Sequence, residues 1–70
     1  MADICSPMSG NIWKILVKEG DKVKEGDELM IMEVMKMEVP IACSCDGEVK
    51  RLAVNEEDAV EADAVVAVVE

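Results

Sequence analysis

The most restrictive feature of this sequence is an internal repeat that spans most of the chain. When the sequence is shifted by 37 positions, Gly10 falls on Gly47 and Asp21 falls on Asp58, with no insertion between them. The same register matches Ile4 with Ile41, Ile12 with Val49, Ile15 with Leu52, Val17 with Val54, Glu19 with Glu56, Val23 with Val60, Leu29 with Val66, Ile31 with Val68 and Glu33 with Glu70. This register predicts two copies of one unit related by a pseudo-two-fold axis, because a single copy could not bury its apolar face alone.

Each copy has the pattern of short β-strands. Residues 10–17 carry β-branched and apolar side chains, and residues 28–34 and 64–69 are mostly apolar runs of strand length. The pairs Gly20-Asp21, Gly26-Asp27 and Asp46-Gly47 are turn signals. Short strands with polar turns predict an all-β barrel or sandwich. Residues 55–69 are rich in Ala and Glu and could form a helix, but the matched segment contains two glycines, so we favour strands there too.

The two copies differ at turn positions where glycine matters. Gly20 is replaced by Glu57, and Gly26 is replaced by Asp63. Glycine adopts positive φ at little cost, whereas Glu does so poorly and Asp only somewhat better. Either these turns differ in conformation between the copies, or the second copy carries some strain.

Four further residues are expected at special backbone positions. The matched Gly10 and Gly47 are expected to need positive φ, so a valine at either position should destabilise the fold. Pro7 and Pro40 suit the start of a strand or an edge strand, because proline has no N–H to donate to a ladder.

Length and composition exclude several classes of protein. A chain of 70 residues forms one domain with a thin core, and the absence of histidine rules out Ser–His and Cys–His catalysis. Sixteen acidic and seven basic residues give a net charge of −9, so nucleic acid and anionic membranes are not expected partners. The acidity favours solubility, with docking onto basic partner surfaces as the functional alternative.

Cysteine usage and hydropathy predict a reducing compartment and no membrane insertion. The chain has three cysteines, Cys5, Cys43 and Cys45, and an odd number without a secretory signal is typical of reduced thiols. Residues 1–10 do not show the charged and apolar regions of a signal peptide. No apolar run approaches the roughly 18 residues of a membrane span.

The segment that joins the two copies is the candidate functional site. Residues 33–38 read Glu-Val-Met-Lys-Met-Glu between two apolar runs, which predicts a hairpin with Met35 and Lys36 as its central pair. Two-residue hairpin turns favour Asn-Gly, Asp-Gly or Gly-X, because the central residues need positive φ. Sequences tend to break such local rules at functional sites. A lysine amine exposed at this tip and flanked by flexible methionines is a candidate for acylation by an external enzyme.

The repeat also predicts where the tip lies relative to the chain ends. Glu33 matches Glu70, so the symmetry mate of the hairpin is the region where the chain begins and ends. We therefore expect the termini at one pole of the domain and Lys36 at the opposite pole. That arrangement suits a carrier that is tethered at one end and presents its cargo at the other.

Residues 33–38 resemble the biotinylation motif of biotinyl domains, in which the acceptor lysine lies between two methionines. The resemblance covers nearly the whole chain. Residues 6–10 are similar to the family's opening strand and turn, residues 15–23 to the stretch before the acceptor hairpin, and residues 44–49 to the turn of the second unit. The Met-Lys-Met core is specific in this context, although alone it would be a weak tripeptide match.

This resemblance to the biotin carboxyl carrier family implies a fold. The chain would form an all-β flattened barrel, a barrel-sandwich hybrid of two four-stranded antiparallel sheets with pseudo-two-fold symmetry. Residues 1–70 would be a single biotinyl domain, with pseudo-repeats 4–33 and 41–70 joined by the acceptor hairpin 34–37. The domain would be a carrier and not an enzyme.

The resemblance also implies a cofactor, partners and site residues. A biotin protein ligase would attach biotin to Lys36 through an amide bond, consuming ATP. A biotin carboxylase or a decarboxylase component would load carboxyl on the biotin ring, and a carboxyltransferase would move it to or from an acyl-CoA or 2-oxo-acid. Met35 and Met37, with Glu33 and Val34, would contribute to recognition. The location would be the cytoplasm, or the mitochondrial matrix for a domain of a eukaryotic carboxylase.

The chain departs from the family pattern in two places. Val34 stands where alanine is usual, which bears on ligase kinetics. The protruding thumb of bacterial acetyl-CoA carboxylase carriers has no room between Gly10 and Glu19. Its absence favours the carriers of other biotin-dependent carboxylases, decarboxylases or transcarboxylases, or a stand-alone carrier.

Three other interpretations remain open. Lipoyl domains of 2-oxo-acid dehydrogenase complexes resemble this fold, but acidic residues usually precede their lysine, whereas Met35 does so here. An unmodified adaptor would tolerate Lys36→Gln. A thiol metal protein would use Cys43 and Cys45, but structural zinc needs four ligands, so we expect no metal site. Cys43 matches Ser6 in the repeat and is expected at an ordinary strand position.

Two sets of side chains complete the predictions. Met30 and Met32 are expected in the core, because alternate residues of a strand face one way and methionine fills cores well. Trp13 matches Lys50 and either covers one edge of the core or lies partly exposed at a contact with a partner.

Overall fold

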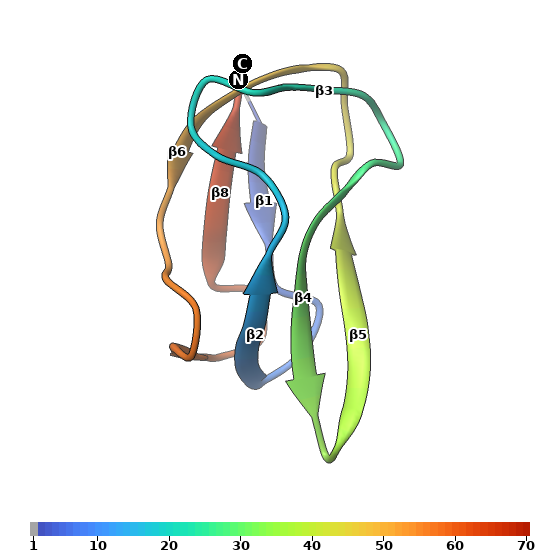
Figure 1. The fold of residues 1–70 in the computed structure, drawn as a ribbon, viewed down its shortest axis with the longest axis vertical. Helices are drawn as coiled ribbons and strands as arrows, with labels where there is room; N and C mark the ends of the chain where they lie inside the picture. Colours follow the sequence, from blue (N-terminus) through green and yellow to red (C-terminus); the bar gives the residue numbers. More distant parts are fainter. Residues whose placement is uncertain (1) are drawn as a thin grey trace.

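A computed structural model describes residues 2–70 as eight β-strands in two layers (Figure 1). The strands are β1 (Ala2–Cys5), β2 (Gly10–Ile15), β3 (Lys22–Val23), β4 (Glu28–Val34), β5 (Met37–Ala42), β6 (Gly47–Leu52), β7 (Ala59–Val60) and β8 (Val65–Val69). One sheet has the order β1-β8-β6-β3, the other has the order β5-β4-β2-β7, and all pairs are antiparallel. Across the described residues the two sheets stay separate, so the flattened architecture is a sandwich and the predicted barrel is not closed.

The predicted pseudo-two-fold symmetry is confirmed by the strand order. A shift of 37 residues superimposes the bounds of β2 on those of β6 and the bounds of β3 on those of β7. The copies are also interleaved, because the first sheet takes β1 and β3 from the first copy and β6 and β8 from the second. Neither copy could therefore complete a sheet by itself.

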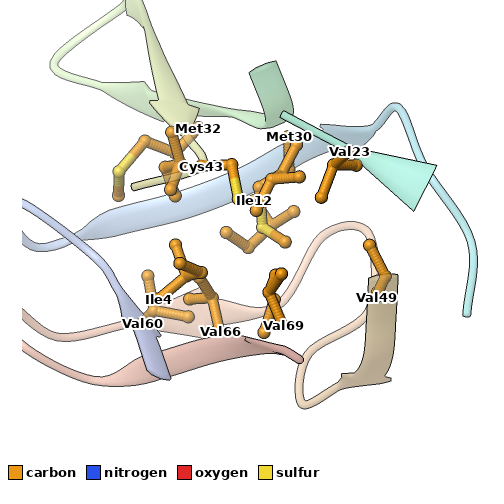
Figure 2. Packing of buried hydrophobic residues seen from close by; sticks show 13 residues of the cluster. Ile4, Ile12, Val23, Met30, Met32, Cys43, Val49, Val60, Val66 and Val69 are labelled. Atoms are coloured by element: carbon orange, nitrogen blue, oxygen red, sulfur yellow. The ribbon is translucent and has the colours of Figure 1, made fainter. Parts of the chain in front are cut away.

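The core lies between the two sheets and consists almost entirely of aliphatic and methionine side chains. Met30 and Met32 are fully buried, as predicted. Figure 2 shows Met30 and Met32 on one side of the core and Ile4, Val66 and Val69 on the other. The burial of these side chains is the main force that holds the two sheets together.

Matched β-bulges break the strand alternation in both copies. The ladder between β2 and β4 shifts register at Trp13, and the ladder between β6 and β8 shifts register at Lys50. A bulge leaves one residue unpaired and re-aims its side chain. As a result, Trp13 and Lys14 are both exposed, and so are Lys50 and Arg51. The ladders β4–β5 and β1–β8 carry a second matched pair of bulges.

The turns that differ in sequence between the copies have the same backbone conformation. Gly20 and Gly26 have φ values of 96° and 93°, and their counterparts Glu57 and Asp63 have values of 75° and 68°. The turns therefore do not differ in conformation between the copies, and the second copy carries the backbone strain that was the other alternative. The second copy places side chains in the left-handed region, where the first copy uses glycine.

The prediction that Gly10 and Gly47 need positive φ is wrong. Neither residue has a positive φ, and glycine is required instead because neighbouring backbone passes too close for a side chain. A Cβ atom on Gly10 would lie 2.6 Å from the carbonyl oxygen of Glu33 and 2.7 Å from Cγ2 of Val34. A Cβ atom on Gly47 would lie 2.6 Å from the carbonyl oxygen of Glu70.

Some of the acidic residues have a structural role, which differs from the two roles in solubility and docking that were expected from the sequence. Exposed carboxylates accept hydrogen bonds from backbone N–H groups in matched pairs. Glu19 Oε2 accepts from Leu52 (3.0 Å), Glu56 Oε2 from Ile15 (3.1 Å), Asp21 Oδ2 from Lys18 (3.0 Å) and Asp58 Oδ2 from Asn55 (2.8 Å). The first two bonds cross between the copies and satisfy donors where β2 and β6 end.

The remaining sequence predictions differ from the structure mainly at strand ends. β2 stops at Ile15, two residues earlier than predicted, and β8 begins at Val65. Pro40 lies in the edge strand β5, as predicted, whereas Pro7 lies in the loop between β1 and β2. Residues 55–69 form turns and strands. Among residues 2–70 there is no helix that could span a membrane.

Candidate functional site

The hairpin between β4 and β5 has the two-residue turn that the sequence predicts. Val34 pairs with Met37, and Met35 and Lys36 between them have φ values of 50° and 67°. Positive φ at both central residues is what the common two-residue hairpin turn requires. For a residue with a side chain this conformation costs about 1–2 kcal/mol. The flanking ladder therefore holds an unfavourable turn in place at the tip.

The side chains of the tip point into solvent. Met35 is 91% exposed, Met37 is 67% exposed, and Lys36 is exposed between them. Figure 1 shows that this turn projects beyond every other loop at its end of the molecule. A reagent or an enzyme can therefore reach the Lys36 amine from several directions.

The base of the hairpin is fixed against the domain. Val34 is half-buried and packs against the core cluster. Gly10 lies directly under this base, because its missing side chain makes room for the Glu33 carbonyl and Val34. Sequence reasoning found Gly10 through the repeat but did not connect it to the hairpin. A glycine at the start of a strand, where close backbone approach is common, was the available signal.

Two carboxylates face each other across the hairpin behind the tip. Glu33 and Glu38 are paired residues of the β4–β5 ladder, and both are exposed. The one ion pair within residues 2–70 joins Lys50 Nζ and Glu48 Oε2 at 3.4 Å, on β6. Neither carboxylate of the hairpin is therefore neutralised by a salt bridge.

The termini lie at the pole opposite the hairpin, as predicted. Figure 1 shows the start of β1 and the end of β8 together at one end of the long axis, with the β4–β5 turn at the other end. Ala2 pairs with Val69 at that pole. The molecule measures 31 Å along its longest axis and 17 Å along the next, so the two poles are well separated.

The cysteines do not form a site. Cys43 is buried just after β5, not within a strand as predicted, and its Sγ donates to the carbonyl of Cys45 at 2.9 Å. The matched Ser6 donates from Oγ to the carbonyl of Met8 at 2.6 Å. Each of the two side chains therefore makes a hydrogen bond to the carbonyl two residues later in the chain. Loss of hydration raises the pKa of the Cys45 thiol, and the neighbouring Cys43 raises it further. No group of His, Cys, Asp and Glu in the described part of the chain is placed to hold a metal.

The sequence of the whole folded region decides the family. Residues 2–69 match the Biotin_lipoyl family, which is described as "Biotin-requiring enzyme". The chain belongs to this biotin/lipoyl attachment family. As a biotinyl domain, it has biotin as its covalently attached cofactor and is a non-catalytic carrier domain of the kind found in biotin-dependent carboxylases.

Individual relatives of this biotinyl domain are both small and very large. The biotin/lipoyl attachment protein of Bacillus subtilis is 47% identical over 53 residues, which cover 76% of this chain and 73% of that protein. The mitochondrial methylcrotonoyl-CoA carboxylase subunit alpha of Dictyostelium discoideum is 41% identical over 69 residues, which cover 99% of this chain but 10% of that protein. The crystal structure of Kluyveromyces lactis urea carboxylase matches with a TM-score of 0.93 and 33% identity, over 99% of this chain and 6% of that one.

Proposed function

We propose that Lys36 is the residue that carries biotin, and that residues 34–37 are the acceptor hairpin of a single biotinyl domain formed by residues 1–70. The observation that carries this proposal is an exposed lysine at the tip of a two-residue turn. The backbone of this turn has positive φ, a conformation that glycine or asparagine would adopt more easily than lysine. A residue type that the turn does not favour, at an exposed tip of the domain, indicates selection for chemistry.

A covalent cofactor fits this site, because attachment needs only a reachable primary amine. In the attachment step, the deprotonated Nζ of Lys36 attacks a biotin carboxyl group that a biotin protein ligase has activated with ATP. The amide bond forms, the activating group leaves, and the amine proton passes to solvent. Acylation removes the lysine charge. When bound, biotin would hold a carboxyl group for transfer.

The residues around Lys36 orient and present the arm. Met35 and Met37 offer adaptable apolar contacts to an enzyme that grips the tip. Val34, packed on the core above Gly10, keeps the base of the arm rigid. Glu33 lies two residues before Met35 and can contribute a charge to recognition. These side chains form the recognition set of the hairpin.

The partners of the loaded carrier follow from this role. A biotin carboxylase or a decarboxylase component would load the carboxyl group, and a carboxyltransferase would move it to or from an acyl-CoA or a 2-oxo-acid. The distance between the hairpin and the chain termini supports this exchange, because an attached domain or linker at the opposite pole would not obstruct the arm. The cytoplasm or the mitochondrial matrix would house these partners, and the mitochondrial carboxylase relative in Dictyostelium supports the second location.

Replacement of Lys36 tests the proposal directly. With biotin, ATP and a biotin protein ligase, we expect the unaltered chain to gain the mass of one biotinyl group and to bind avidin. Lys36→Arg should lose both completely while its melting temperature stays unchanged, because the side chain is exposed. Lys24→Arg, at another exposed lysine, is the matched control and should behave like the unaltered chain.

Two results would contradict the proposal. Avidin capture of the Lys36→Arg variant would place the acceptor elsewhere. A lipoyl adduct in place of a biotinyl adduct, in chain purified from its native cells, would assign the domain to the lipoyl branch.

A further inference from the structure

The outer faces of the two sheets differ, although the repeat makes them equivalent. On the outer face of the sheet that carries the hairpin, Trp13, Leu16 and Pro40 are exposed and Ile31 is half-buried, and we call this set the Trp13 face. The matched positions on the other sheet hold Lys50, Ala53, Val68 and Asp3. The matched strands accommodate Lys50, Ala53 and Asp3 with the same ladder geometry, so the fold does not require a large apolar side chain at the positions of Trp13, Leu16 and Pro40. The apolar residues of the Trp13 face therefore need another explanation.

The Trp13 face is one continuous surface across three neighbouring strands. Ile31 of β4 pairs with Lys14 of β2 on one side and with Pro40 of β5 on the other. Trp13 precedes Lys14 in the bulge, where it is 49% exposed, and Leu16 is 44% exposed beyond the end of β2. Exposed tryptophan beside other apolar side chains is typical of a protein contact surface.

This face is continuous with the acceptor hairpin. β4 and β5 form both structures, and Ile31 lies three residues before Val34, or about 10 Å at the rise of a strand. Between them lies the row of Asn11, Glu33 and Glu38, which are paired across the same three strands. A protein that holds the tip of the hairpin can therefore cover the acidic row and the Trp13 face together.

The charges on the two outer faces indicate what kind of surface would cover each. On β6, Lys50 and Glu48 form an ion pair with each other. Glu33 and Glu38 have no salt bridge among the described residues and would complement a basic partner. A second molecule of this protein is a poor candidate for that partner, because each 70-residue chain carries a net charge of −9 and two such chains repel each other.

We propose that the Trp13 face is the docking surface for the biotin protein ligase, which would meet it with an apolar patch bordered by basic side chains. The inference rests on the proposed function of Lys36. A bare lysine is short, so an enzyme that acylates its Nζ must approach the backbone of the turn and contact the surface behind it. A biotinylated arm reaches much further, so the carboxylating partners have less need of this surface.

Exchange of residues between the matched positions provides the test. Trp13→Lys gives the bulge on β2 the residue that the matched bulge on β6 already accommodates, so the variant should fold. Pro40→Asp is a second, independent variant of the same design, since Asp3 is its counterpart. Lys50→Trp is the control, because it places a tryptophan on the opposite face. Circular dichroism melting verifies the fold of each variant.

The readout is the initial rate of biotinylation by a biotin protein ligase as the concentration of the carrier is varied. We expect Trp13→Lys and Pro40→Asp each to raise KM by about tenfold with kcat within about twofold, because an interface tryptophan and its neighbours supply binding energy. Lys50→Trp should leave KM unchanged. Added salt should raise the KM of the unaltered chain, since charged rims are screened.

Several results would overturn the inference. One is an unchanged KM for folded Trp13→Lys while the unaltered chain is biotinylated normally. Another is unchanged biotinylation with slower carboxylation of the loaded variant, which would place the face at the carboxylase. If the unaltered chain forms concentration-dependent dimers and Trp13→Lys abolishes them, the face is a contact with a second molecule of this protein. If Lys36 in the unaltered chain accepts no biotin at all, the proposed function itself fails, and this is distinguishable from a change in KM.

Discussion

The two halves of this domain serve as each other's control. Where they agree, as in the bulges, the buried core and the carboxylates that accept backbone N–H groups, the shared feature is what the fold requires. Where they differ, the fold does not explain the choice of residue. The main differences lie in the hairpin that only one pole possesses, in the Trp13 face, and in two turns. Comparison of the halves thus separates architecture from function within one chain.

The largest expected effect concerns the matched glycines under the two poles. Gly10→Ala and Gly47→Ala should each lower the free energy of unfolding by about 1–3 kcal/mol, because the added Cβ meets a backbone oxygen that cannot move freely. Denaturant titration measures this cost. Only Gly10→Ala should also slow biotinylation, because it displaces Val34 at the base of the hairpin.

The decisive comparison is between two measurements on these glycine variants. The loss of unfolding free energy should be similar in both, whereas the rate of biotinylation should fall in Gly10→Ala alone. Equal losses of biotinylation in both variants would show that general destabilisation, and not hairpin placement, controls the rate. In that case the comparison of the poles would carry no functional meaning.

A smaller effect is expected at the turns where the halves differ. Gly20→Ala should cost about 1 kcal/mol, and Glu57→Gly should stabilise the domain by about 0.5–1 kcal/mol, since both change the strain of a left-handed backbone position. The space around Gly20 is open, so packing does not obscure the result. Thermal unfolding of the two variants measures the effects. A gain in stability from both substitutions would contradict the assigned strain.

The smallest effect is expected at Cys43. Cys43→Ser should change stability by less than about 1 kcal/mol, because the matched Ser6 makes the same hydrogen bond to a carbonyl two residues later. Biotinylation should be unaffected. Denaturant titration together with the ligase assay measures both quantities, and a loss of carrier function in this variant would revive the thiol metal interpretation.

Sequence reasoning predicted the symmetry, the core methionines and the hairpin because each leaves a pattern in the order of residues. The repeat fixed which residues are equivalent, and strand periodicity then placed Met30 and Met32 inside. The turn pair Met35-Lys36 was predictable because residues 33–38 join the two repeats between two apolar runs, and the pairing of Val34 with Met37 confirms it.

Other features depend on which strands become neighbours in space, and no local pattern records that. The role of Gly10 requires knowing that β4 passes over it, so the prediction of positive φ was wrong. The carboxylates of Glu19 and Glu56 accept hydrogen bonds from backbone N–H groups of the opposite copy. From composition alone, these residues could be interpreted only as surface charge. The exposure of Trp13 comes from a bulge, and a bulge interrupts the alternation from which burial is predicted.

The interleaving of strands has a consequence for the origin of the domain. Two separate half-length chains with this pattern would have to exchange strands to complete both sheets, so their simplest assembly is a symmetric, strand-swapped dimer. Fusion of such a dimer closes one pole with a covalent bend and leaves the other pole open. Duplication and fusion would therefore create, in one event, the difference between a pole that carries the Met35-Lys36 turn and a pole where the two ends of β1 and β8 meet.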